Sequence, residues 1–95
     1  MPNNNGRLSG KVAIVTGAGS SGPGVGNGKA AAILFAREGA KVLLVDQVLS
    51  RAEETLELIL KESGEAAAFE ANVIKEDDCR DMVEQAIGRF GRLDI

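Results

Sequence analysis

Residues 11–32 read KVAIVTGAGSSGPGVGNGKAAA. A short apolar run opens this stretch, an alanine-rich segment closes it, and six of the chain's twelve glycines lie between Gly17 and Gly28. A continuous apolar run bounded by glycine is typical of a strand buried on both faces. Where a strand, a glycine-rich turn and a helix start meet, unpaired N–H groups and the positive helix end converge. The stretch therefore predicts an anion site and not a flexible linker.

The alternation of strand-like and helix-like segments continues along the rest of the chain. Apolar runs predict a second strand over residues 41–47 and a third over 66–73, and LDI at 93–95 predicts the start of a fourth. This order predicts an α/β fold, a Rossmann-type doubly wound parallel sheet that stops after its third helix, at the start of the fourth strand. We expect residues 1–10 to form a flexible tail and residues 11–95 to form the N-terminal part of a dinucleotide-binding domain.

Two of the predicted helices carry distinct signals. Ser50 followed by Glu53 has the spacing of a capping box, which predicts that the second helix begins at Ser50. The third helix is predicted from apolar residues that recur every three or four positions and should face the core. These residues are Cys79, Met82, Val83, Ala86, Ile87 and Phe90.

Composition and charge narrow the classes of function. The 95-residue chain has a formal net charge of −3, which disfavours binding to nucleic acid or to an anionic membrane surface. Its apolar runs are far shorter than the roughly 20 residues that a membrane span needs. A single cysteine rules out an internal disulfide and is typical of a reducing compartment. With no signal peptide visible at the start, we expect a cytoplasmic protein.

Two familiar phosphate-binding motifs do not fit the glycine-rich stretch. The nucleoside-triphosphate loop, G-x-x-x-x-G-K-[ST], fails because Pro23 and Ala30 stand where it needs a glycine and a hydroxyl. A literal G-x-G-x-x-G begins at Gly17, but Pro23 and Gly24 follow it, so a helix cannot start properly there.

A third arrangement fits better, and it resembles the short-chain dehydrogenase/reductase family. Thr16 and Gly17 end the first strand, and GNGKAAAILFAREGAKVLLVD (26–46) runs through an alanine-rich helix into the second strand, similar to the family's T-G-x-x-x-G-x-G pattern. The opening LSGKVAIVTGAGS and the closing FGRLDI are also similar, so the resemblance covers nearly the whole chain. Gly28 lies five residues further along than the pattern places its last glycine, which indicates a loop insertion.

The resemblance implies roles for the residues of the glycine-rich stretch. Gly17 is expected to be the turn glycine, with Gly19 and Ser20 in the enlarged loop. Gly26 should let the backbone approach a pyrophosphate, to which the Asn27 N–H would donate. The last glycine of the stretch, at position 28, should let the helix pack closely on the first strand.

Asp46 ends the second predicted strand and bears on the choice of dinucleotide. A carboxylate there accepts hydrogen bonds from the hydroxyls of the adenosine ribose and repels a 2′-phosphate, which favours NAD over NADP. The simpler alternative is a turn or cap aspartate. Asn72 and Val73 correspond to the family's adenine-contacting segment, with an ordinary polar turn as the alternative. The expected cofactor-binding residues are Gly17, Gly19, Ser20, Gly26, Asn27, Gly28, Asp46, Asn72 and Val73.

The resemblance also implies hydride transfer between a nicotinamide cofactor and an alcohol or carbonyl substrate. The family's catalytic tyrosine, lysine and serine have no counterparts here, and the chain has no tyrosine or histidine. We therefore assign no catalytic residue and no metal ligand, and expect an inactive cofactor-binding portion of an oxidoreductase that acts on a small molecule and is a homo-oligomer at full length. The alternatives are a non-catalytic nucleotide-binding module and a methyltransferase-type Rossmann domain. Val15 and Thr16 disfavour the latter, because methyltransferases generally carry an acidic residue there.

Overall fold

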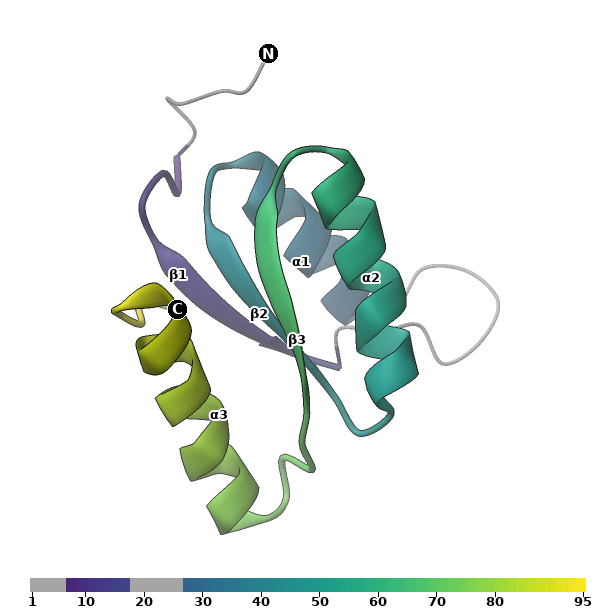
Figure 1. Ribbon diagram of the computed structural model, residues 1–95, viewed down its shortest axis with the longest axis vertical. Coiled ribbons are helices and arrows are strands. Elements are labelled where there is room, and N and C mark those ends of the chain that lie inside the picture. Colours follow the sequence, from purple (N-terminus) through teal and green to yellow (C-terminus); the bar gives the residue numbers. More distant parts are fainter. Residues whose placement is uncertain (1–6, 18–26) are drawn as a thin grey trace.

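The computed structural model of the chain describes residues 7–17 and 27–95. Within these ranges three strands alternate with three helices, as the sequence predicts (Figure 1). The elements are β1 (Val12–Thr16), α1 (Asn27–Arg37), β2 (Lys41–Asp46), α2 (Leu49–Lys61), β3 (Glu65–Glu70) and α3 (Glu76–Phe90).

The strands form a parallel sheet in the order β1-β2-β3, so the predicted α/β fold is confirmed. The middle strand, β2, pairs Lys41 with Val12 on one side and with Glu65 on the other. Its four central residues, Val42 to Val45, have no solvent exposure. Burial on both faces explains why this strand is a continuous apolar run and not an alternating one.

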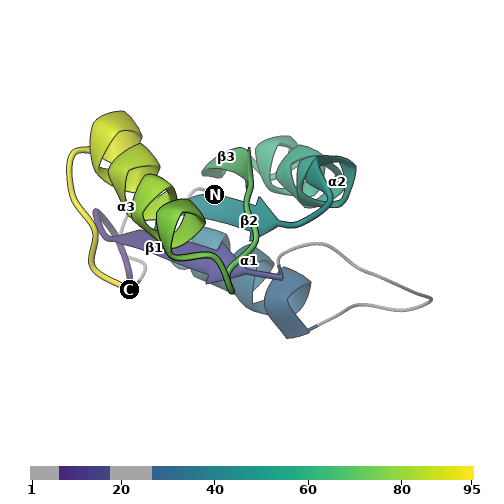
Figure 2. The same ribbon diagram turned by 90° about the horizontal axis from the view of Figure 1, so that it is seen from below.

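Helices cover both faces of the sheet. On one face, α1 and α2 contribute Ala32 and Ile59 to a cluster with Leu44 of β2. On the other face, α3 contributes Ala86 to a cluster that includes Leu43. Figure 2 shows α1 and α3 on opposite sides of β1. The result is the layered arrangement of a doubly wound sheet.

The last residues run along the edge of β1 that faces away from β2. The Ile95 N–H donates to the Val12 carbonyl at 3.1 Å, and the Ile95 carbonyl accepts the Ile14 N–H at 3.1 Å. This pattern is that of parallel pairing. The predicted start of a fourth strand therefore lies next to β1, and α3 crosses the sheet between β3 and this position. The strand order thus reverses at β1, where ligands of open α/β sheets bind.

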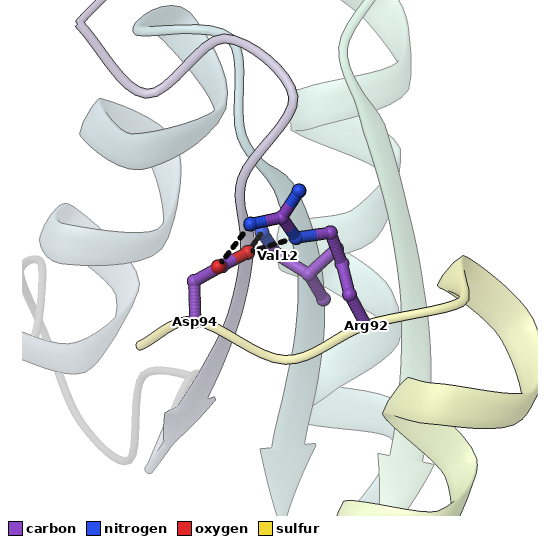
Figure 3. A network of polar contacts seen from close by, with 3 residues as sticks. All are labelled: Val12, Arg92 and Asp94. Atoms are coloured by element: carbon purple, nitrogen blue, oxygen red, sulfur yellow. Dashed lines mark hydrogen bonds and ion pairs between the residues drawn. The ribbon is translucent and has the colours of Figure 1, made fainter.

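An ion pair fixes this last segment to the start of β1 (Figure 3). The Arg92 guanidinium donates to both carboxylate oxygens of Asp94, at 2.8 and 2.6 Å. These two hydrogen bonds, together with the Val12 N–H, lower the pKa of Asp94 below its usual value. The pair lies at the amino end of β1, at the opposite end of the strand from Thr16.

Part of the segment predicted to be a tail is joined to the domain. Residues 7–10 form a turn in which the Leu8 N–H donates to the Glu38 carbonyl at 2.9 Å. The Leu8 side chain packs against the cluster under α1 and α2. Residues 1–6 lie outside the described part of the chain.

Two sequence-based expectations about helices need correction. The predicted capping box at Ser50 and Glu53 is wrong, because α2 begins at Leu49 and its N-cap residue is Val48, which makes no side-chain capping hydrogen bond. The Val48 N–H instead donates to the Asp46 carboxylate at 2.9 Å, which starts the turn into α2 earlier.

The apolar side of α3 is also only partly in the core. Ala86 is buried, and Met82 and Phe90 are half-buried against the cluster that contains Leu43 and Ala86. Val83 and Ile87 are 37% and 49% exposed. A narrow sheet leaves one flank of this helix without a neighbour among the described elements.

Candidate functional site

The candidate site lies at the carboxyl ends of the strands, beginning with the turn after β1. Gly17 has φ 61°, in the left-handed region that favours glycine. The α1 backbone then approaches this turn very closely. A Cβ atom on Gly28 would lie 2.8 Å from the Gly17 carbonyl carbon and 2.9 Å from the Thr16 carbonyl oxygen. Only glycine at position 28 permits this contact, which sets the start of α1 against the end of β1.

The amino end of α1 therefore lies at the carboxyl end of β1. Its first turn contains no acidic residue, so no side-chain carboxylate offsets the positive end of the helix dipole. Such an end favours a bound anion. Among the predicted contacts, Asn27 is the first residue of this helix. Gly19, Ser20 and Gly26 lie outside the described residues.

Asp46 ends β2 and is half-buried. One carboxylate oxygen accepts the Val48 N–H at 2.9 Å, which restricts the side chain. Its carbonyl accepts the Ala71 N–H at 3.1 Å, and this bond joins the ends of β2 and β3. The turn role considered for Asp46 is present in the structure, and it leaves the carboxylate at the carboxyl edge of the sheet.

Asn72 lies just beyond β3 and is held by several hydrogen bonds. Its N–H donates to the Asp78 carboxylate at 2.8 Å, and its carbonyl accepts the Lys75 N–H at 2.9 Å. Its side-chain oxygen accepts the Ile74 N–H at 3.1 Å and the Gln47 amide at 3.4 Å. Asn72 is therefore a turn residue whose side-chain oxygen already accepts two hydrogen bonds, a shorter one from Ile74 and a longer, weaker one from Gln47.

The turn after Asn72 is also fixed by α3. The Val73 carbonyl accepts the Cys79 thiol at 3.1 Å, and the Val73 side chain is 44% exposed. Cys79, expected in the core, is half-buried and serves this contact.

A cavity of about 360 Å³ opens between the ends of β2 and β3 and the first turn of α3. Of the described residues predicted for the site, Asn72 is the one that lines this cavity. Asp46 does not line it, but its neighbour in the chain, Gln47, does. Sequence reasoning missed the others. No spacing rule links a residue that follows β2, such as Gln47, with the turn after β3 and the first turn of α3. The lining residues are Gln47, Glu70, Ala71, Asn72, Lys75 and Asp78.

Residues 7–17 and 27–95 contain neither a metal-binding cluster of side chains nor a membrane-spanning helix. There, no group of three or more acidic, cysteine or histidine side chains could hold a metal ion. No helix in these ranges is both long and apolar enough to cross a membrane.

Comparison with known proteins decides the family. The sequence model of the short chain dehydrogenase family matches residues 11–95. A short-chain dehydrogenase/reductase homolog of Bacillus subtilis is 41% identical over 90% of this chain and 74% of its own length. The chain belongs to the short-chain dehydrogenase/reductase family.

Other members of the short-chain dehydrogenase/reductase family are longer. An uncharacterized oxidoreductase of Thermotoga maritima is 45% identical over 93% of this chain but 32% of its own length. The crystal structure of hydroxysteroid dehydrogenase from Escherichia coli superposes with a TM-score of 0.87 at 36% identity, covering 97% of this chain and 37% of that one. The chain thus spans about a third of these two proteins.

Proposed function

We propose that this chain is the NAD-binding portion of an oxidoreductase that acts on an alcohol or carbonyl substrate. The family implies a nicotinamide cofactor, which when bound supplies the hydride acceptor or donor. The residues at the strand ends fit such a group. Gly28 leaves no room for a side chain where α1 meets β1, so the helix's unpaired N–H groups can approach a pyrophosphate.

Asp46 is the observation that supports NAD. It lies at the end of β2, next to the strand that leads into the glycine turn. The bond from the Val48 N–H orients its carboxylate at this edge. We propose that this carboxylate accepts the ribose hydroxyls of the adenosine half and disfavours a 2′-phosphate by charge repulsion.

The cavity beside Asn72 is proposed to receive the adenine base. The Gln47 bond to the Asn72 side-chain oxygen is long, and the exocyclic amine of adenine can replace it. The Val73 carbonyl is occupied by the Cys79 thiol, so the Val73 N–H is the main-chain group proposed to contact the base.

These residues are proposed to bind the cofactor and not to transfer a proton. The sequence contains no tyrosine or histidine, the side chains best suited to exchange a proton with an alcohol near neutral pH. We propose that the chain alone binds the cofactor without turnover. As the family implies, the complete protein is proposed to act on a small molecule as a homo-oligomer.

Parallel calorimetric titrations with NAD, NADP and S-adenosylmethionine test this function. The wild-type chain is expected to prefer NAD. Asp46→Ala should reduce the ratio of NAD to NADP affinity about tenfold or more, the loss expected for a hydrogen bond to a charged group. The control variant Asp81→Ala removes an exposed acid on α3 and should leave the ratio unchanged. Tighter binding of S-adenosylmethionine, or an unaltered ratio in Asp46→Ala, contradicts the proposal.

A further inference from the structure

The first turn of α3 contains three acidic residues that lie in different surroundings. Glu76 is exposed, and Asp77 pairs with Arg80 at the surface. Asp78 is half-buried and lines the cavity. Its carboxylate accepts the Asn72 N–H at 2.8 Å, a bond that reaches back over six positions to the end of β3. All three carboxylates can interact favourably with the positive end of the α3 dipole, but only Asp78 accepts this hydrogen bond from Asn72.

The bond that Asn72 donates to the Asp78 carboxylate differs in kind from the other bonds at Asn72. The bonds from Lys75 and Ile74 lie within the turn itself. The Asp78 bond joins the turn to α3, and an ionised acceptor makes it strong. Without it, a partly buried main-chain N–H would lose its partner, which is costly.

The contrast with Gln47 suggests a division of roles. The Gln47 amide lies 3.4 Å from the Asn72 side-chain oxygen, near the limit of a hydrogen bond. It can therefore give way to an incoming donor. The Asp78 bond is on the main chain of Asn72, so it persists while the side chain exchanges partners.

We propose that Asp78 is a positioning residue that holds the main chain of Asn72 so that its side-chain oxygen faces the amine of a bound adenine base. This inference rests on the proposed function, because it assigns a cause to base recognition at the same cavity. Asp78 does not contact the base itself. It acts through Asn72, and its removal should weaken the discrimination between bases as well as the overall affinity.

The test compares NAD with its hypoxanthine analogue, which lacks the exocyclic amine. Calorimetry of the wild-type chain, Asp78→Ala, Asp78→Asn and the matched control Asp77→Ala gives the adenine-to-hypoxanthine affinity ratio. Asp78→Ala should weaken NAD binding about tenfold, as expected for the loss of a charged hydrogen bond, and bring the ratio close to one. Asp78→Asn keeps an acceptor oxygen and should restore most of the ratio. Asp77→Ala should leave it at the wild-type value.

Amide hydrogen exchange at Asn72 in the ligand-free chain gives a second readout. It uses Asp78→Asn, so it remains available even if Asp78→Ala does not fold. Exchange should be several-fold faster in Asp78→Asn than in the wild type or Asp77→Asn, because a neutral acceptor holds the N–H less tightly. An unchanged base preference in Asp78→Ala, or equal exchange in the wild type, Asp78→Asn and Asp77→Asn, overturns the inference while wild-type NAD binding keeps the proposed function. A wild-type chain that binds neither dinucleotide overturns both.

Discussion

The carboxylate of Asp94 accepts the main-chain N–H of Val12 at 2.9 Å, although the two residues lie 82 positions apart (Figure 3). The Asp94 N–H in turn donates to the Val12 carbonyl at 2.9 Å. Val12 is the first residue of β1, so this double link holds the end of the chain against the strand next to the glycine turn. Arg92 keeps the carboxylate in place from the other side.

This link makes stability depend on pH. The Arg92 guanidinium and then the Val12 N–H lower the pKa of Asp94 in the folded chain. Stabilisation by a carboxylate with a lowered pKa is complete above the unfolded value of about 4 and is lost as the pH falls through the folded value. Asp94→Asn should therefore be less stable than the wild type at neutral pH, and the difference should shrink in acid. Urea denaturation at a series of pH values measures this, with exposed Asp81→Asn as the control. A difference that stays constant into strong acid would contradict it.

Gly28 and Gly88 provide a matched pair of glycine substitutions inside helices. Gly28→Ala should destabilise the chain by about 1–3 kcal/mol, because its Cβ would overlap the Gly17 carbonyl group. A Cβ on Gly88 meets no atom within 4 Å, so Gly88→Ala should stabilise by about 0.5–1 kcal/mol through helix propensity. Thermal and urea unfolding followed by circular dichroism give both values. If Gly28→Ala is as stable as the wild type, the close approach of α1 to β1 is incorrect.

The strands were predictable because burial on both faces leaves a simple signature. Val42 to Val45 form an apolar run in the sequence, and all four are fully buried in the structure. Predicting this strand required no knowledge of which segments pack against it. The packing role of Gly28 was predicted through the family resemblance, because the loop before it is longer than the usual pattern and its position had to be found from the helix that follows.

Other features depend on particular side-chain contacts that no periodicity or spacing rule encodes. The start of α2 follows the bond that the Val48 N–H donates to the Asp46 carboxylate, in place of the expected cap at Ser50. The role of Asp78 depends on how α3 meets the end of β3, and its sequence context is that of an ordinary helix start. Helical periodicity placed Val83 on the apolar side of α3, but it cannot tell how far the sheet extends beneath that side.

Ile59 and Leu60 are neighbours on α2 with opposite environments. Substituting each in turn tests whether Ile59 packs in the cluster with Ala32 and Leu44. Ile59 is 1% exposed between α2 and the sheet, whereas Leu60 is 52% exposed. Ile59→Ala should cost about 2–5 kcal/mol of unfolding free energy through lost burial and the cavity left behind. Leu60→Ala should change it by less than about 0.5 kcal/mol. Urea unfolding of the two variants is the measurement, and similar losses in both would mean that α2 is rotated about its axis.

Val83 and Ile87 lie one turn apart on α3, and both are substantially exposed. Ile95, on the edge of β1, is 49% exposed as well. Exposed apolar side chains one turn apart on a helix, like those of an incompletely covered strand edge, favour association between copies of a chain. The double variant Val83→Thr, Ile87→Gln should therefore sediment closer to a monomer at high concentration than the wild type, with little change in unfolding free energy. The comparison variant Leu34→Gln changes an exposed apolar residue of α1, on the other face of the sheet, and should sediment like the wild type. Equal sedimentation of all three chains would show that the exposed side of α3 does not mediate association.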